Sequence, residues 1–299
     1  MPTTLLAGGT GFIGTRLTEM LRERGHTVRI LTRHPRGEGQ FAWDTEKETI
    51  DENAVAGVDF IINLAGAGIA DKRWTPARKR ELIDSRVKST HLLERAIIKT
   101  GVRLQAFVSS SAIGFYGNSG EQSMHESDLP ADQSFMVECC RLWEEAVAPI
   151  SAMGMRTVIF RTGVVLGKEG GALAELIKPL YFGIGGYFGN GRAWYSWIHL
   201  EDICRMYVWA LENPEANGIY NAVAPHPARI KPLVQALVRA WRKPALVLPV
   251  PAFALRVWFG EMSATILNSN FVSADKIQQA GFTFEHPMVE EAMQSIFQK

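Results

Sequence analysis

The residues with the clearest chemical use are three glycines near the N-terminus. Residues 8–14 read Gly-Gly-Thr-Gly-Phe-Ile-Gly, so Gly9, Gly11 and Gly14 fit the spacing G-x-G-x-x-G. Such a turn lets the backbone approach a pyrophosphate without a Cβ in the way, and it aims the N-terminus of a helix at the anion. The pattern predicts a dinucleotide-binding turn, although a glycine-rich turn can also serve tight packing alone. The residues expected to contact the cofactor here are Gly8, Thr10, Gly11, Phe12, Ile13 and Gly14.

The flanking residues support the functional interpretation. An apolar run at 3–7 precedes the turn, residues 13–21 place their apolar side chains on one helical face, and Gly25 stands where a helix C-terminus favours glycine. A second strand is expected at 27–32. Strand, turn, helix and strand then fit in about 30 residues, as a βαβ nucleotide unit requires.

The end of the second expected strand indicates which dinucleotide binds. NAD-preferring units carry a carboxylate there for the ribose hydroxyls, but this chain has Thr32 and Arg33, with Arg36 nearby. A guanidinium pairs with a 2′-phosphate that a carboxylate would repel. The sequence therefore favours NADP over NAD, unless Arg33 is an ordinary solvated loop charge.

Two further segments should border the cofactor. The apolar run 58–64 predicts a buried parallel strand, and ligands of such sheets lie at the strands' carboxyl ends, so Leu64, Ala65 and Gly66 are candidates. Thr75 and Pro76 predict the start of a helix that runs to about Lys99. Arg86 on this helix either reaches a cofactor phosphate or ribose, or belongs to a solvated face.

A serine cluster follows the next expected strand, which covers 104–108. Ser109 is assigned to the cofactor, and Ser111 and Tyr116 are the candidate catalytic residues, because a hydroxyl beside the nicotinamide can hydrogen-bond a carbonyl or alcohol. The alternatives are a hydroxyl-capped loop for the serines and simple packing for Tyr116.

The composition excludes several classes of protein. The net charge is +1, which gives no indication of nucleic acid or an anionic membrane as a partner. The seven His residues lack metal-ligand spacing, and the three Cys residues suit a reducing compartment. The first apolar run is too short for a signal peptide, so a cytoplasmic location is expected.

The expected fold is α/β, a Rossmann-type doubly wound parallel sheet with a smaller C-terminal substrate lobe. The predicted division is 1–225 for the nucleotide-binding domain and 226–299 for a mainly helical lobe. The glycine-rich segment 168–197 is expected to form loops over a cleft and not core elements, with aromatic side chains that pack the lobe or line a substrate wall.

Several motifs together resemble the extended short-chain dehydrogenase/reductase pattern. They are residues 8–14, 63–66, 109–117, 161–167 and 197–202. The segments 71–75 and 260–262 further resemble the atypical branch of "epimerase family proteins", which joins an NAD-dependent epimerase/dehydratase domain to a C-terminal domain of unknown function. The resemblance implies a sheet of about seven strands, NADP as the ligand, and cofactor contacts from Thr32, Arg33, Leu64, Ala65, Glu81 and Arg86.

One departure from that pattern limits what it implies. The superfamily pairs a serine with Tyr-x-x-x-Lys, in which the lysine lowers the phenol pKa and holds the ribose. Here Met136 stands in the tyrosine position and Cys140 in the lysine position beside the cofactor, and Tyr195-x-x-x-His199 is the nearest analogue. Ser111 resembles the retained serine.

Two functions stay open at this stage. One is an NADP-dependent, epimerase-like oxidoreductase with a rearranged acid–base set and an unknown small-molecule substrate. Its candidates are Ser111 and Tyr116, helped by Tyr195 or His199. The other is a catalytically degenerate NADP-binding redox sensor or regulator that acts on a protein partner, with a cell-division role as one possibility that the labels of similar proteins suggest.

Overall fold

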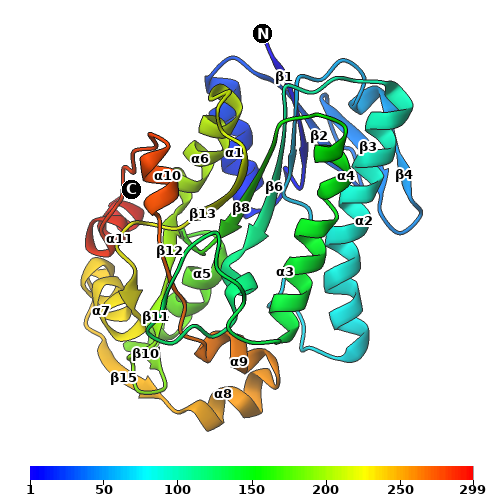
Figure 1. Ribbon diagram of the computed structural model, residues 1–299. Coiled ribbons are helices and arrows are strands. Elements are labelled where there is room, and N and C mark those ends of the chain that lie inside the picture. The colour runs from blue at the N-terminus through cyan, green and yellow to red at the C-terminus, as the bar shows by residue number, and fades with distance from the viewer. Residues whose placement is uncertain (299) are drawn as a thin grey trace.

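A computed structural model describes residues 1–298, which are built around an eight-stranded sheet (Figure 1). Its strands stand in the order β13-β8-β6-β5-β1-β2-β3-β4, and every neighbouring pair is parallel except β3 with β4. The strands are β1 Thr3–Ala7, β2 Thr27–Thr32, β3 Gln40–Asp44, β4 Thr49–Ile50, β5 Phe60–Asn63, β6 Ala106–Ala112, β8 Thr157–Thr162 and β13 Gly218–Ala222. The order reverses between β1 and β5, which is where ligands of such sheets bind.

Helices cover both faces of this sheet, as the doubly wound prediction requires. Helices α1 (Phe12–Glu23) and α6 (Leu200–Glu212) pack on one face, while α2 (Pro76–Thr100), α3 (Phe135–Glu145) and α4 (Ala148–Ala152) pack on the other (Figure 1). Successive strand residues point to opposite faces, so Leu6 joins the core under α1 and α6 while Leu5 joins the core under α2. The predicted fold class is confirmed.

Helix α2 has the ends that its sequence predicts. The hydroxyl of Thr75 accepts a hydrogen bond from the backbone N–H of Arg78 at 3.1 Å, and Pro76 fills the first helical position. Gly101 ends the helix with a left-handed φ of 66°, which costs glycine little. The helix is therefore fixed at both ends by local chemistry.

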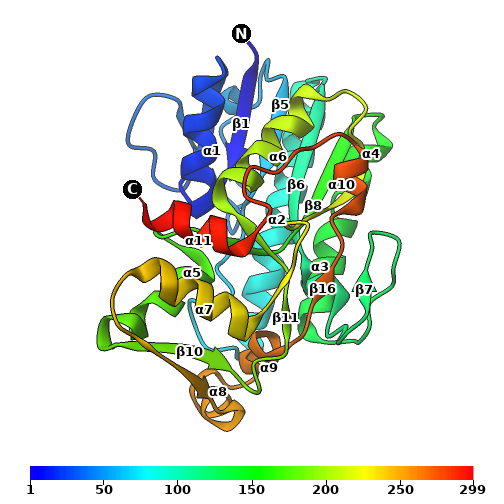
Figure 2. The same cartoon turned by 90° about the vertical axis from the view of Figure 1, so that its left-hand side faces the viewer.

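Most of the remaining elements lie below the carboxyl ends of the strands of the main sheet (Figure 2). Among the others, η1 contacts β2 and α10 packs against β13. The strand pairs are β10 with β15 (parallel), β11 with β14 (antiparallel), β9 with β12 (parallel) and β7 with β16 (parallel). The elements are η1 Glu52–Ala54, η2 Ile113–Tyr116, β7 Ser123–Met124, β9 Val164–Leu166, α5 Gly171–Ile177, η3 Lys178–Phe182, β10 Ile184–Phe188, β11 Trp194–Tyr195, β12 Trp197–His199, β14 Ala228–Arg229, α7 Ile230–Trp241, β15 Leu246–Val250, α8 Ala252–Phe259, α9 Met262–Leu267, β16 Phe271–Val272, α10 Asp275–Gln279 and α11 Val289–Phe297.

The expectation that residues 168–197 form only loops is wrong. This segment contains α5 and β10, and Trp197 is fully buried in the same core cluster as α7 and α11. The glycines serve close packing instead of mobility: a Cβ on Gly185 would lie 2.6 Å from Cγ2 of Val238 on α7. Tyr187 and Phe188 also pack against this cluster.

The segment after residue 226 contacts earlier parts of the chain at more than one place. Strand β16 returns to pair with β7, and α10 packs against β13 at the edge of the main sheet. The division into 1–225 and 226–299 stays a prediction.

Candidate cofactor and active site

The turn between β1 and α1 has no space for a side chain at Gly8 or Gly14. A Cβ on Gly14 would lie 2.2 Å from the carbonyl oxygen of Gly8, and a Cβ on Gly8 would lie 2.9 Å from the carbonyl carbon of Leu64. Gly8 also has a φ of +84°, and the backbone N–H of Gly11 donates to its carbonyl at 3.1 Å. Glycine is therefore required here by both space and conformation.

The N-terminus of α1 is open to an anion. Its first residue follows Gly11, which offers no capping side chain, and the first turn holds no acidic residue. The first-turn N–H groups and the positive end of the helix dipole thus face the turn without a protein anion. Thr10 and Gly11 are exposed and Ile13 is half-buried, so this opening lies at the surface.

Phe12 holds a second loop against the turn. Its ring lies so close to the chain that a Cβ on Gly167 or on Gly170 would each approach it to 2.6 Å. The loop after β9 is therefore packed onto the first residue of α1. This contact places residues 167–171 beside the glycine turn.

Thr32 and Arg33 stand at the carboxyl end of β2, as predicted. Thr32 is half-buried and its hydroxyl accepts from the backbone N–H of His34 at 3.3 Å, whereas Arg33 is exposed. Within residues 1–298, the Arg33 guanidinium makes no hydrogen bond or ion pair with the protein. An exposed, uncommitted cation at this strand end fits a 2′-phosphate.

The loop after β5 is shaped by Asn63, which sequence reasoning passed over. This fully buried residue accepts from the backbone N–H of Ala65 at 3.1 Å through Oδ1 and donates to the Thr90 hydroxyl at 3.0 Å through Nδ2. Leu64 then approaches Gly8, and Gly66 is exposed. The sequence signal for Asn63 was its place as a polar residue at the end of an apolar strand.

Arg86 lies underneath this loop. Its buried guanidinium donates to the carbonyls of Leu82 at 2.8 Å and Ala67 at 3.1 Å, and it sits 4.9 Å from the ring centre of Trp143. A Cβ on Gly66 would come within 3.1 Å of its Cζ. Arg86 therefore fixes the loop at the cofactor's edge, and its direct contact with the cofactor stays a prediction.

Glu81 is paired one turn earlier on α2. It accepts from Arg78 at 2.7 Å, and this guanidinium lowers the pKa of the Glu81 carboxyl. Arg78 is itself buried and donates to the carbonyl of Gly68, while its Nε has no partner within residues 1–298. Sequence reasoning missed Arg78, which links Glu81 to the loop 67–71.

Ser111 belongs to a buried polar network. Its hydroxyl donates to Oε1 of Glu144 at 2.7 Å, and Arg161 binds both carboxylate oxygens of Glu144 at 2.9 Å each. Sequence reasoning gave neither Glu144 nor Arg161 a role in the site, although a charged residue in a buried strand was a signal for Arg161. Ser109 is buried on the same strand and donates to the carbonyl of Ser110 at 3.1 Å.

Tyr116 is the far end of this network. Its hydroxyl donates to Asn221 at 2.7 Å and accepts from Arg161 at 3.0 Å, and the side chain is fully buried. Burial raises its pKa to about 12, with Arg161 partly opposing the rise. Both hydrogen-bonding functions of the hydroxyl are thus engaged by protein groups. The catalytic roles of Ser111 and Tyr116 stay predictions, and this geometry suits Tyr116 to holding η2.

The positions of the missing tyrosine and lysine are apolar. Met136 and Cys140 are buried one turn apart on α3, and a Cβ on Gly114 would lie 3.2 Å from Cε of Met136 and 3.5 Å from Sγ of Cys140. Burial raises the pKa of the Cys140 thiol. The buried members of this apolar cluster are Trp74, Leu82, Met136, Cys140 and Met262. No proton donor with a suitable pKa comes from α3 at these two positions.

Tyr195 and His199 are held by other contacts. The Tyr195 hydroxyl donates to the carbonyl of Ile266 at 3.1 Å. His199 caps α6 by accepting from the backbone N–H of Glu201 at 3.1 Å, and its other ring nitrogen lies 3.2 Å from the Ser295 hydroxyl. Tyr195 and His199 are thus bound to other parts of the chain than Ser111 and Tyr116 are.

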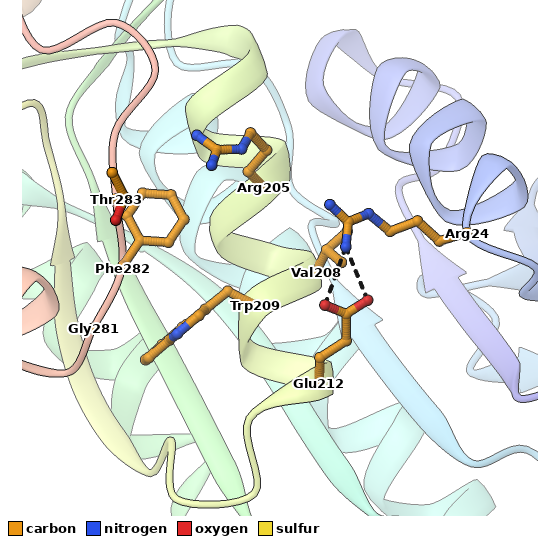
Figure 3. Close-up of a pocket in the computed structure, with 8 residues that line it drawn as sticks. All are labelled: Arg24, Arg205, Val208, Trp209, Glu212, Gly281, Phe282 and Thr283. Atoms are coloured by element: carbon orange, nitrogen blue, oxygen red, sulfur yellow. Dashed lines mark hydrogen bonds and ion pairs between the residues drawn. The ribbon is translucent and has the colours of Figure 1, made fainter.

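A cavity of about 240 Å³ lies elsewhere, at the opposite end of α1 (Figure 3). It is lined by Arg24, Trp209 and Phe282 among others, and Arg24 is bound to both carboxylate oxygens of Glu212 at 3.0 and 3.1 Å. Because α1 runs from the glycine turn toward Arg24, this cavity is separate from the cofactor edge. It plays no part in the site described above.

Two models of known protein families match this chain. Residues 4–223 match the model of the "NAD dependent epimerase/dehydratase family", and residues 250–296 match a "domain of unknown function". The chain belongs to the NAD-dependent epimerase/dehydratase family.

Within residues 1–298, no helix is long and apolar enough to cross a membrane, and no group of three or more His, Cys, Asp and Glu side chains could hold a metal ion.

Members of this epimerase/dehydratase family are similar along the whole chain. The epimerase family protein YfhF of Bacillus subtilis is 37% identical over 97% of this chain and 96% of its own length, and the mouse epimerase family protein SDR39U1 is 34% identical over 98% of both. The crystal structure of human SDR39U1 with NADPH has a TM-score of 0.90 at 31% identity and covers 99% of both chains. A UDP-N-acetylglucosamine 4-epimerase of Bacillus cereus shares the fold, with a TM-score of 0.79 at 18% identity over 100% of this chain and 96% of its own.

Proposed function

We propose that this chain binds NADPH across the carboxyl ends of β1, β2 and β5 and is an epimerase-like oxidoreductase of the family. The observation that carries the cofactor assignment is the glycine turn, in which a Cβ at Gly14 would meet the backbone at 2.2 Å. The similar human protein crystallised with NADPH supports the same ligand. A small-molecule substrate and a cytoplasmic location are parts of the proposal.

The residues present fit the pyrophosphate and the 2′-phosphate of NADPH. The first turn of α1 would hold the pyrophosphate through its backbone N–H groups, and Arg33 would pair with the 2′-phosphate. Leu64, Ala65 and Gly66 would border the adenosine and the linking phosphates. When bound, the reduced nicotinamide supplies a hydride.

The chain's own groups would then exclude water and position the substrate. The cluster around Met136 and Cys140 is buried and apolar, so a carbonyl held near it would be shielded from solvent. Because α3 supplies neither phenol nor ammonium, a proton would come from a group outside α3 or from water. Ser111 is the first candidate in this proposal, and Glu144 orients its hydroxyl.

The same apolar positions favour a second candidate function. A chain whose acid–base positions hold Met136 and Cys140 could bind NADPH without turning over a substrate, and could act as a redox sensor through a protein partner. The discriminating feature is the missing proton donor, not the cofactor site. Both candidates therefore share the NADPH assignment.

The test is to follow the absorbance of NADPH with a library of carbonyl compounds. Turnover that Ser111→Ala lowers at least about a hundredfold, with the Kd for NADPH unchanged, supports the oxidoreductase. Binding of NADPH in the micromolar range with no turnover of any compound favours the sensor. Failure to bind NADPH at all would overturn both.

A further inference from the structure

A group of large apolar side chains is exposed at one end of the molecule. Six of them, here called the apolar tip, are between 44% and 85% exposed, and they come from η3, β15 and α8. They are Phe182, Leu246, Leu248, Phe253, Val257 and Trp258. A concentration of this kind on a soluble fold marks an interaction surface.

The fold brings Phe182 beside the start of β15, although 64 positions of sequence separate it from Leu246. Strand β15 pairs with β10, which follows directly on η3 and Phe182, and Leu246 and Leu248 lie two apart on β15 and therefore on one face. Helix α8 begins after Pro251, and only its Leu255 is buried. Both views show α8 at the end of the molecule opposite the N-terminus (Figures 1 and 2).

The segment 216–260, which supplies five of the six tip residues, carries charges of one sign only. Residues 216–260 contain no Asp or Glu, and their Lys and Arg residues are Arg229, Lys231, Arg239, Arg242, Lys243 and Arg256. Arg242 and Lys243 precede β15, and the exposed Arg256 lies on α8. None of these last three forms an ion pair with another residue of 1–298. The net charge of +1 conceals this local excess because acidic residues elsewhere balance it.

We propose that the apolar tip docks on the surface of a bilayer that contains anionic phospholipids. Aromatic and aliphatic side chains of a short protruding helix can enter the boundary between headgroups and acyl chains, while basic side chains bind the headgroup phosphates. This placement leaves the protein peripheral, and none of the helices described within residues 1–298 is both long and apolar enough to cross a bilayer. It revises the expectation, drawn from net charge alone, that an anionic membrane is no partner.

A second copy of the chain is a poorer occupant of the same surface. A symmetric contact would bring the tip of each copy onto the tip of the other. Arg242, Lys243 and Arg256 would then face their own equivalents, and like charges would oppose the contact. A surface of negative headgroups has the complementary charge.

The test is co-sedimentation of the full chain with phosphatidylcholine vesicles that do or do not contain phosphatidylglycerol. We expect binding only where phosphatidylglycerol is present, and weaker binding as salt rises. The double variant Phe253→Ser/Trp258→Ser should lower the affinity at least about tenfold, since each side chain buries apolar area in the bilayer. Arg242→Glu/Lys243→Glu should lower it to a similar degree by removing the attraction to the headgroups.

The matched control is Leu129→Ser, which changes an apolar side chain that is 82% exposed outside the tip. It should bind vesicles as the unchanged protein does. All variants should keep their affinity for NADPH, which shows that they fold. Equal binding to both kinds of vesicle, or full binding by the tip variants, overturns the proposal. Loss of self-association in the tip variants, without vesicle binding by the unchanged protein, would also overturn it and assign the tip to a second copy.

Discussion

Glu144 and Arg161 form a two-pronged ion pair in the interior of the protein. Nε and Nη2 of the arginine each lie 2.9 Å from a different carboxylate oxygen, and the two side chains are 9% and 3% exposed. The pair joins α3 to β8, and Ser111 of β6 donates to the same carboxylate. One carboxylate thus ties a covering helix to two strands of the sheet.

Removing the charge of Glu144 should destabilise the fold. Glu144→Gln leaves the Arg161 guanidinium buried without a counter-ion, and the free energy of unfolding should fall by about 3 kcal/mol. Urea unfolding followed by circular dichroism measures this. The control is Glu145→Gln, whose partner Arg141 is 50% exposed, so its loss should be at most about 0.5 kcal/mol. Equal losses in both variants would show that burial of the pair contributes nothing.

The glycine turn should not tolerate a methyl group. Gly14→Ala places a Cβ against the carbonyl of Gly8 and forces the turn open, so the affinity for NADPH should fall by more than about tenfold. Isothermal titration calorimetry gives the Kd. Gly37→Ala is the matched control, because a Cβ there meets nothing within 4 Å. Undiminished binding by Gly14→Ala would remove the turn from the cofactor site.

Arg33 should distinguish the two nicotinamide cofactors. Arg33→Ala removes a charge-assisted contact with the 2′-phosphate, so the Kd for NADPH should rise about ten- to a hundredfold while the Kd for NADH hardly changes. Fluorescence titration with both cofactors tests this. Arg22→Ala, a change at another exposed arginine, should leave both affinities as they are. An equal loss for the two cofactors would contradict the assignment.

Tyr116 should make stability fall in alkaline solution. Burial raises its pKa from 10.0 to about 12 in the folded chain, so the folded state favours the protonated phenol. That stabilisation is complete below pH 10 and is lost as the pH rises toward 12, by about 3 kcal/mol over the whole interval. Tyr116→Phe cannot titrate, so its stability should fall less steeply above pH 10. Urea unfolding from pH 9 upward gives the free energy of unfolding against pH for both proteins. Parallel curves would mean that folding does not change the pKa of the Tyr116 phenol.

Features set by neighbours in the sequence could be predicted, and features set by distant contacts could not. Thr75, Pro76 and Gly101 define α2 through local hydrogen bonds and conformations, so the sequence was sufficient for them. The network of Glu144 and Arg161 joins elements whose proximity depends on how the sheet is assembled. The interpretation of 168–197 was wrong because glycine suits both a loop and a tight contact, and only the partner Val238 decides between them.

The same distinction between local and distant contacts applies to the candidate site. The glycine turn and Arg33 lie beside predicted strand ends, so their positions followed from the order of strands and helices. The burial of Tyr116 depends on Asn221, which is 105 positions away, and no pattern near Tyr116 indicates it. Whether a hydroxyl faces a ligand or an amide is therefore decided by tertiary structure.

The buried carboxylate of Asp202 accepts hydrogen bonds from the backbone N–H groups of Glu285 at 2.8 Å and His286 at 2.9 Å. Together with the pairing of β16 and β7, this contact ties residues 271–286 to β7 and α6. The two hydrogen bonds of Asp202 join residues 83 and 84 positions apart. Forming them closes a long loop of chain, which costs more conformational entropy than a local turn does.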